Sequence, residues 1–178
     1  MPSDEAPPTR YRCSDLILAL FCFNRQNWSI SKDNFSDNDE GKGKNTHQRE
    51  VQRRAQQRRL LETIELEVTP TIRYRLVLFE VCSLLHSYAL AGRKCIPLIH
   101  EVDHVLQTHL DTLTWRQIGT VLWAYARLHH RPSFVPRLGA MYISMSKTKG
   151  TRRMNWFEHS LLCRSLWALA VLQVDKQL

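Results

Sequence analysis

An apolar pattern with helical spacing recurs along the second half of the chain. The string VLWAYARLHH at Val121–His130 is matched by SLWALAVLQV at Ser165–Val174, so Leu-Trp-Ala-x-Ala-x-Leu occurs twice with its tryptophans 44 positions apart. A weaker copy, LLHSYALAGRK at Leu84–Lys94, lies 37 positions upstream and carries His86 in place of the tryptophan. A period of 20–50 residues is typical of solenoids, so the pattern predicts a stack of helical hairpins.

Each signature helix, here called helix A, is followed by a second segment that opens with a proline. These segments, called helix B, are Pro97–Leu110 and Pro132–Ser146. A proline in the first turn of a helix is tolerated because its missing N–H has no intrahelical partner there. On a wheel of 100° per residue, Thr112–Arg131 has a polar side and a broad apolar face, and the apolar face is predicted to be buried. His129-His130 are predicted to cap this helix at its end. The apolar face consists of Trp115, Ile118, Val121, Leu122, Tyr125, Ala126 and Leu128.

Four segments are expected along the chain. They are an N-terminal helical segment (1–23), a disordered acidic and basic linker (24–46), a basic amphipathic helix (47–69) and about two and a half hairpins (70–178). The linker is rich in Ser, Asn, Asp, Lys and Gly, a composition typical of disorder, and Thr69-Pro70 is predicted to end the basic helix. The fold class is therefore all-α, a right-handed stack of helical hairpins (an α-solenoid fragment) with a partly disordered N-terminal segment.

Composition and targeting signals narrow the setting. With 43% hydrophobic and 24% charged residues the chain can build a core, and no stretch is long and apolar enough to predict a membrane span. MPSDEAPPTR resembles neither a secretory signal nor a transit peptide. The five cysteines form no C-x-x-C pair and are expected to be buried hydrophobic residues of an intracellular protein, without a disulfide framework.

The net charge of +8 is concentrated on the repeats. Residues 1–69 carry 11 basic and 11 acidic side chains, whereas residues 70–178 carry 14 and 6. A basic helical array attracts polyanions by releasing their condensed counterions, so the charge favours RNA as the partner. A solvated surface, or a face docked to an acidic protein, is the alternative.

One stripe of helix A is a candidate RNA contact. Arg116, Thr120, Arg127 and Arg131 fall within about 60° of one another on the wheel, beside Trp123, and could follow a phosphate backbone. Ser83 and Arg164 are the counterparts of Thr120, and a position that is polar but different in each copy suits the reading of one nucleotide per repeat. The candidate RNA-binding residues are Arg116, Thr120, Trp123, Arg127, Arg131, Ser83, Lys94 and Arg164.

Two other interpretations of these residues stay open. The stripe is strongly basic only in the middle repeat, which also fits a solvated helix face. Trp123 and Trp167 fit packing between hairpins as well as base stacking. A secondary basic surface is predicted on the helix upstream, formed by Arg49, Arg53, Arg54, Arg58 and Arg59.

LWAYARLHHRP and LWALAVLQV resemble the LWALAKLG-type helix of octotricopeptide-like repeats, which also occurs in the arrays that precede RAP domains in FAST-kinase-like proteins. The resemblance covers residues 76–178 at best. It implies RNA binding in a mitochondrion or plastid, in transcript stabilisation, processing or translation, or as part of a divergent mitochondrial ribosome. The chain departs from the pattern in its uneven repeat lengths, in the missing RAP domain, and in a third helix A without its helix B.

One string points to catalysis. His100-Glu101-Val102-Asp103-His104 matches H-E-x-x-H, in which two histidines one helical turn apart bind zinc and the glutamate acts as general base. Positions 107 and 110 are Gln and Leu, so the third ligand of the extended motif is missing. In the repeat interpretation the string is helix B of the first hairpin, with its polar residues facing solvent.

The sequence thus predicts a non-catalytic organellar RNA-binding repeat protein without a cofactor. The alternatives are a structural subunit of a mitochondrial ribosome, contacting ribosomal RNA and other subunits, and a protein-binding α-solenoid. Zinc hydrolysis through His100, His104 and Glu101 is a distant alternative.

Overall fold

The computed structural model describes residues 13, 15–22, 43–149 and 155–173, and every regular element in these ranges is a helix. The all-α class predicted from the sequence is therefore confirmed. The chain forms two compact units, residues 1–71 and 72–178, which are considered separately below. Most of the predicted linker, residues 24–42, lies outside the described residues.

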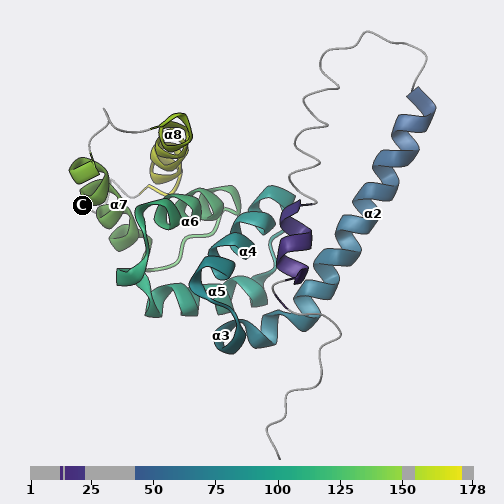
Figure 1. Cartoon of the computed structure of the whole chain (residues 1–178), viewed down its shortest axis with the longest axis horizontal. Helices are drawn as coiled ribbons and strands as arrows, with labels where there is room; N and C mark the ends of the chain where they lie inside the picture. Colours follow the sequence, from purple (N-terminus) through teal and green to yellow (C-terminus); the bar gives the residue numbers. More distant parts are fainter. Residues whose placement is uncertain (1–12, 14, 23–42, 150–154, 174–178) are drawn as a thin grey trace, which may run out of the picture. The chain divides into compact units, whose positions relative to one another are not determined.

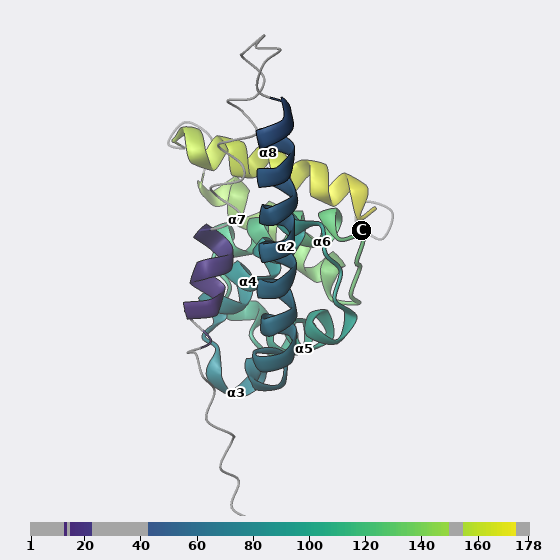
Figure 2. The same ribbon diagram turned by 90° about the vertical axis from the view of Figure 1, so that its right-hand side faces the viewer.

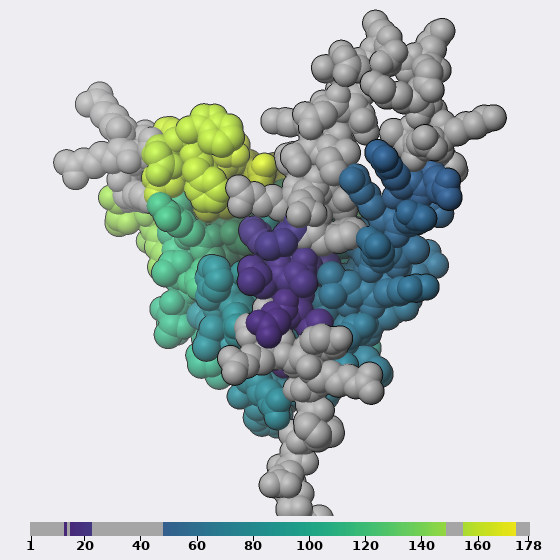
Figure 3. Space-filling view, turned by 45° about the vertical axis from the view of Figure 1, so that its right-hand side comes forward, coloured from purple at the N-terminus to yellow at the C-terminus, as the bar shows by residue number. Residues whose placement is uncertain are grey.

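Helix α2, Gly43–Glu67, dominates the described part of the first unit (Figure 1). It begins within the segment expected as a linker and gives way to a 3-10 turn, η1 (Thr69–Thr71), around the Thr69-Pro70 stop signal. Leu61, Ile64 and Val68 are buried, whereas nearly all described side chains from 48 to 59 are exposed. Residues 13 and 15–22 lie beside α2 in Figure 3, and the Cys13 thiol is 3.4 Å from the Thr71 hydroxyl.

The second unit stacks three A helices side by side (Figures 1 and 2). The A helices are α4 (Leu78–Ala91), α6 (Trp115–Arg127) and α8 (Trp156–Val171), and the B helices are α5 (Ile96–Thr108) and α7 (Val135–Lys149). Helix α6 packs between α4 and α8 and against α7, while α4 packs on α5. A short α3 (Ile72–Arg75) packs on α5, and a 3-10 turn, η2 (Leu110–Thr112), precedes α6.

Capping residues explain where the A helices begin. The Thr114 backbone N–H donates to Gln117 Oε1 (2.9 Å), and the Glu158 N–H donates to Asn155 Oδ1 (2.9 Å), so α6 and α8 each start at a capping box. Helix α7 begins at Val135, three residues later than predicted from Pro132. The reason is that a second proline, Pro136, occupies its first turn, while the Pro132 carbonyl accepts a turn hydrogen bond from Val135 N–H.

The C-terminal caps of the A helices repeat with the sequence period. Gly92, His129 and Gln173 have φ angles of 64°, 48° and 53°, and they are the described residues with left-handed backbone. Their spacings of 37 and 44 residues equal those of the apolar signature. In the first two copies the next N–H donates to a tyrosine carbonyl, Arg93 to Tyr88 and His130 to Tyr125, as in a Schellman cap. The predicted capping role is thus confirmed for His129, through its backbone.

The predicted apolar face of α6 forms the core of the unit. All seven of its residues are buried, and none is more than 7% exposed. Helix α8 approaches α6 at Gly119, where an added Cβ would lie 2.7 Å from Ser165 Oγ and 3.2 Å from Leu161 Cγ. Because real Cβ atoms do not come so close, glycine is required for this packing distance.

The left-handed caps lead to a stability prediction. Gly92→Ala should lower the free energy of unfolding by about 1 kcal/mol, because a Cβ disfavours positive φ even though no atom lies within 4 Å of its position. His129→Gly should raise it by about 0.5 kcal/mol by relieving the same strain. Urea unfolding followed by circular dichroism measures both, with His129→Ala, which keeps the Cβ, as a near-neutral control. Equal stability of Gly92→Ala and wild type would contradict the shared cap.

Candidate nucleic-acid interface

Trp123 lies at the junction of all three A helices. Its ring centroid is 5.0 Å from that of His86 on α4, and the guanidinium carbons of Arg127 on α6 and Arg164 on α8 are each 5.9 Å from it. The indole is partly buried, as expected for a tryptophan that packs between neighbouring hairpins. Both arginines remain exposed, which leaves a pair of cations at the solvent edge of the ring.

His86, the counterpart of the tryptophans, is held neutral. Burial, and secondly the positive charge of Arg164, lower its pKa from 6.5 to about 4. An uncharged imidazole beside Trp123 avoids a third positive charge next to Arg127 and Arg164. The two guanidinium groups of Arg127 and Arg164 can therefore lie near the neutral His86 and Trp123 rings at neutral pH.

The first residue of the predicted stripe is tied to the neighbouring repeat. Arg116 Nη2 donates to Glu158 Oε1 at 2.9 Å, and the Glu158 side chain is only 6% exposed. The same carboxylate accepts from the Asn155 N–H at the start of α8. Arg116 keeps 59% of its side chain exposed, yet its charge balances a buried carboxylate, so its first role is to join α6 to α8.

Lys94 and Arg131 make equivalent bonds to the next repeat. Lys94 Nζ donates to the His129 carbonyl at 2.9 Å, and Arg131 Nη2 donates to the Gln173 carbonyl at 3.4 Å. Donors and acceptors both stand at repeat-equivalent positions, so we call the pair the inter-repeat hydrogen bonds. Arg131 lies beyond the end of α6 at Arg127, which corrects its placement on the helical wheel; the helix stops there because His129 turns left-handed.

The position that varies between repeats is unevenly accessible. Ser83 and Thr120 are partly buried, and the Thr120 hydroxyl donates to the carbonyl of Arg116 at 2.9 Å. Arg164 is exposed. Within the described residues, no carboxylate lies within ion-pair distance of Lys94, Arg127, Arg131 or Arg164, which leaves these four cations without an acidic partner there.

The H-E-x-x-H string does not form a metal centre in the described part of the chain. His100 and His104 are exposed, and no three His, Cys, Asp or Glu side chains there are grouped to hold a metal ion. Glu101, the expected base, forms a two-pronged ion pair with Arg73, with Arg73 Nη2 to Oε1 at 3.0 Å.

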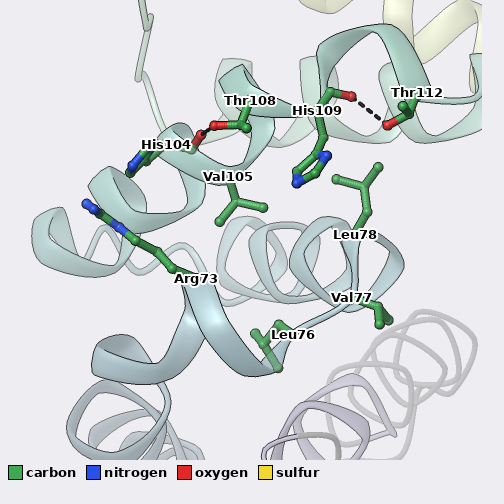
Figure 4. A pocket seen from close by; sticks show the side chains of 9 residues that line it. All are labelled: Arg73, Leu76, Val77, Leu78, His104, Val105, Thr108, His109 and Thr112. Atoms are coloured by element: carbon green, nitrogen blue, oxygen red, sulfur yellow. Dashed lines mark hydrogen bonds between the residues drawn. The ribbon is translucent and has the colours of Figure 1, made fainter.

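His104 instead borders an open hollow of about 480 Å³ together with Arg73 and His109 (Figure 4). The lining includes no carboxylate. Its only metal-binding side chains are the imidazoles of His104 and His109, and two ligands are fewer than the three protein ligands of a catalytic zinc site.

Asp103 belongs to a polar network that the sequence did not reveal. The prediction that the polar residues of this helix face solvent is wrong for Asp103, whose carboxylate accepts from Tyr125 Oη at 2.5 Å and lies 2.7 Å from His130 Nε2. The aspartate turns inward because the phenol of α6 and the imidazole just after it meet α5 at this level. Burial, and then the nearby carboxylate, raise the pKa of Tyr125 well above 10.

The remaining predicted residues are spread over both units. Arg49, Arg53, Arg54, Arg58 and Arg59 are all exposed on α2, where Arg54 pairs with Glu50 at 2.5 Å. The expectation of buried cysteines holds for Cys13 and Cys82 but is wrong for Cys22 and Cys163, which are exposed. Burial raises the pKa of the Cys82 thiol to about 12, so it stays protonated.

No family model matches the chain, and no curated protein or solved structure is significantly similar to it. Among the described helices, none has the length and apolar character needed to cross a membrane. The likeness to octotricopeptide-like repeats therefore stays an expectation from sequence.

The environment of His86 predicts a pH dependence of stability. Its pKa of about 4 in the folded chain lies below the ordinary 6.5, so the unfolded chain binds more protons between these values. Stability should therefore fall as the pH is lowered from 6.5 to 4, by up to about 3 kcal/mol from this group. Urea unfolding at stepped pH should show a shallower loss for His86→Gln, whereas the exposed His104→Gln should follow wild type. Parallel curves for His86→Gln and wild type would disprove the assignment.

The inter-repeat hydrogen bonds predict a second effect on stability. Lys94→Met keeps the aliphatic stem but removes the donor to the His129 carbonyl, and should lower the free energy of unfolding by about 1 kcal/mol. Lys147→Met, an exposed lysine of α7, is the matched control and should change it by less than about 0.3 kcal/mol. Chemical denaturation compares the two, and an equal loss would show that the Lys94 bond adds nothing.

Proposed function

We propose that the chain is a non-catalytic helical-repeat protein that binds single-stranded RNA along the cationic edge of its A helices. The observation that supports this most is the set of four exposed cations that have no acidic partner among the described residues, Lys94, Arg127, Arg131 and Arg164. They come from all three repeats, and two of them flank the ring of Trp123. Phosphates attract guanidinium groups strongly, and an aromatic edge between cations offers a surface for a base.

The inter-repeat hydrogen bonds do not remove Lys94 and Arg131 from this surface. A guanidinium has five N–H donors and an ammonium three, and the bonds described use one of each. Their neutral carbonyl acceptors leave the positive charges uncompensated. The same side chains can therefore join repeats and attract a polyanion.

The setting follows from the resemblance and belongs to the same proposal. We place the protein in a mitochondrion or plastid, where it would act in transcript stability, processing or translation with other subunits of a ribonucleoprotein. The proposal includes no catalytic step and no cofactor. Glu101 is engaged by Arg73, which gives no support to the zinc alternative.

A structural role in a ribonucleoprotein is the second candidate, and α2 favours it. Its residues 48–59 are almost all exposed and include five arginines pointing to different sides of the helix. A helix that is basic and uncovered all round suits insertion into folded RNA better than tracking of one strand. Substitution of its five arginines by Gln would weaken RNA binding more than any change on the A helices if this candidate holds.

The test compares RNA affinity across a salt series. The double variant Arg127→Gln/Arg164→Gln removes two cations that pair with no carboxylate in the described part of the chain, and it leaves the Arg116 pair and both inter-repeat bonds intact. The logarithmic salt slope for a single-stranded RNA pool should become shallower by about 1.4, since each of the two phosphate contacts contributes about 0.7 on single strands.

Arg137→Gln is the matched control, because this exposed arginine of α7 already pairs with Asp111 at 2.7 Å. Its slope should equal that of wild type. If the double variant and the control behave alike, the A-helix edge does not bind RNA.

A further inference from the structure

The outer face of α8 is an apolar surface that no described element covers. Trp156, Leu166, Trp167 and Val171 are 82%, 53%, 47% and 38% exposed. Figure 3 shows the surface of α8, in yellow-green, open to solvent in that view. Helices α4 and α6 each pack against a following A helix and a B helix, whereas the described residues supply neither to α8.

The exposed face of α8 corresponds to the face of α6 against which α8 packs. The α6 side of that contact includes Arg116, Gly119 and Trp123, which meet Glu158, Ser165 and Arg164. At the repeat shift of 44 residues their counterparts on α8 are Ser160, Cys163 and Trp167. Ser160 is partly exposed and the other two are exposed, so an equivalent face recurs on α8 and none of the described residues occupies it.

A second copy of the chain is poorly suited to this surface. In a head-to-tail stack, α4 of one copy would pack on α8 of another copy, as α8 packs on α6. The residues of α4 that make this contact would be the counterparts of Ser165 and Ala168. Those counterparts are Leu84 and Ser87, and both are already 0% exposed. A symmetric pair of α8 helices would bring together two repeat units that each carry 14 basic and 6 acidic residues, which is electrostatically unfavourable.

We propose that α8 is the docking surface for a helix of another polypeptide that packs as a further A helix of the array. The α6–α8 contact defines the chemistry of this helix. It carries a cation over Trp167, as Arg164 lies over Trp123, within an apolar stripe. It also has Gly or Ala opposite Cys163. In the α6–α8 contact Ser165 faces Gly119, whose counterpart on α8 is the larger Cys163, so a smaller residue than serine is needed there. The surface is distinct from the cationic edge, and its occupation does not depend on RNA binding.

The test uses a helical peptide as the probe and the full chain as the receptor. The peptide has the sequence of residues 155–173 with Ala in place of Ser165, and a hydrocarbon cross-link at positions 159 and 163 holds it helical on the side away from the contact. Fluorescence anisotropy of the labelled peptide should show saturable binding to the wild-type chain. Trp167→Asp in the chain should weaken it at least tenfold.

Phe157→Asp is the matched control, because it also replaces an exposed aromatic of α8 by aspartate. Phe157 lies about 120° round the helix from Cys163, and its counterpart Leu113 precedes α6. Peptide binding should be unchanged in this variant. Absence of saturable binding, or equal binding by Trp167→Asp and wild type, would overturn the proposal.

Light scattering of the chain alone tests whether a second copy of the chain occupies the α8 surface. A monomer, with peptide binding as above, supports a helix from another polypeptide. A dimer that Trp167→Asp converts to a monomer would overturn that choice in favour of a second copy. The RNA salt slope should be the same for Trp167→Ala and wild type, because alanine adds no charge one turn from Arg164. This proposal and the proposed function can therefore fail independently.

Discussion

The distance between α6 and α8 is the constraint on which the rest of the array depends. It is set at Gly119, where a single added carbon would lie 2.7 Å from Ser165 Oγ. Because protein interiors are packed at crystal-like density, such a carbon would force the Ser165, Tyr142 and Leu161 side chains, or α8 itself, to move away. The Arg116–Glu158 ion pair and the placement of Arg164 over Trp123 both cross this contact. They hold only while the two helices stay this close, so a glycine without side-chain chemistry controls the geometry of the polar groups around it.

The basic residues of the repeats serve the array before they serve a ligand. Arg116 neutralises a buried carboxylate, and Lys94 and Arg131 each donate to the carbonyl of a left-handed residue in the next repeat. Of these three, Arg116 has its charge balanced by a carboxylate, whereas Lys94 and Arg131 bond neutral carbonyls and keep their positive charges uncompensated by those bonds. Arg127 and Arg164, by contrast, contact an aromatic ring, and a guanidinium stacked on a ring keeps its N–H donors directed outward.

Apolar periodicity was sufficient to predict the helices and the core, because burial of one helix face is a local property of the sequence. The seven residues placed on the apolar face of α6 are all buried. The partners of the polar residues could not be predicted in the same way. Asp103 looks like a solvent-facing residue of α5 until Tyr125 and His130 are brought to it from a later part of the chain. Glu158 likewise gives a capping signal in sequence but no indication that it would meet Arg116, 42 residues away.

The stacking also changes what a reading position would be. The sequence suggested one variable polar residue per repeat, at Ser83, Thr120 and Arg164, each acting within its own hairpin. In the structure, Arg164 of the third A helix lies over Trp123 of the second, and Trp123 in turn lies against His86 of the first. A base that reached Arg164 would therefore meet side chains of two repeats at once. If RNA binds at this edge as we propose, base recognition would be a property of the seam between repeats, and the smallest unit able to support it would be a pair of adjacent A helices.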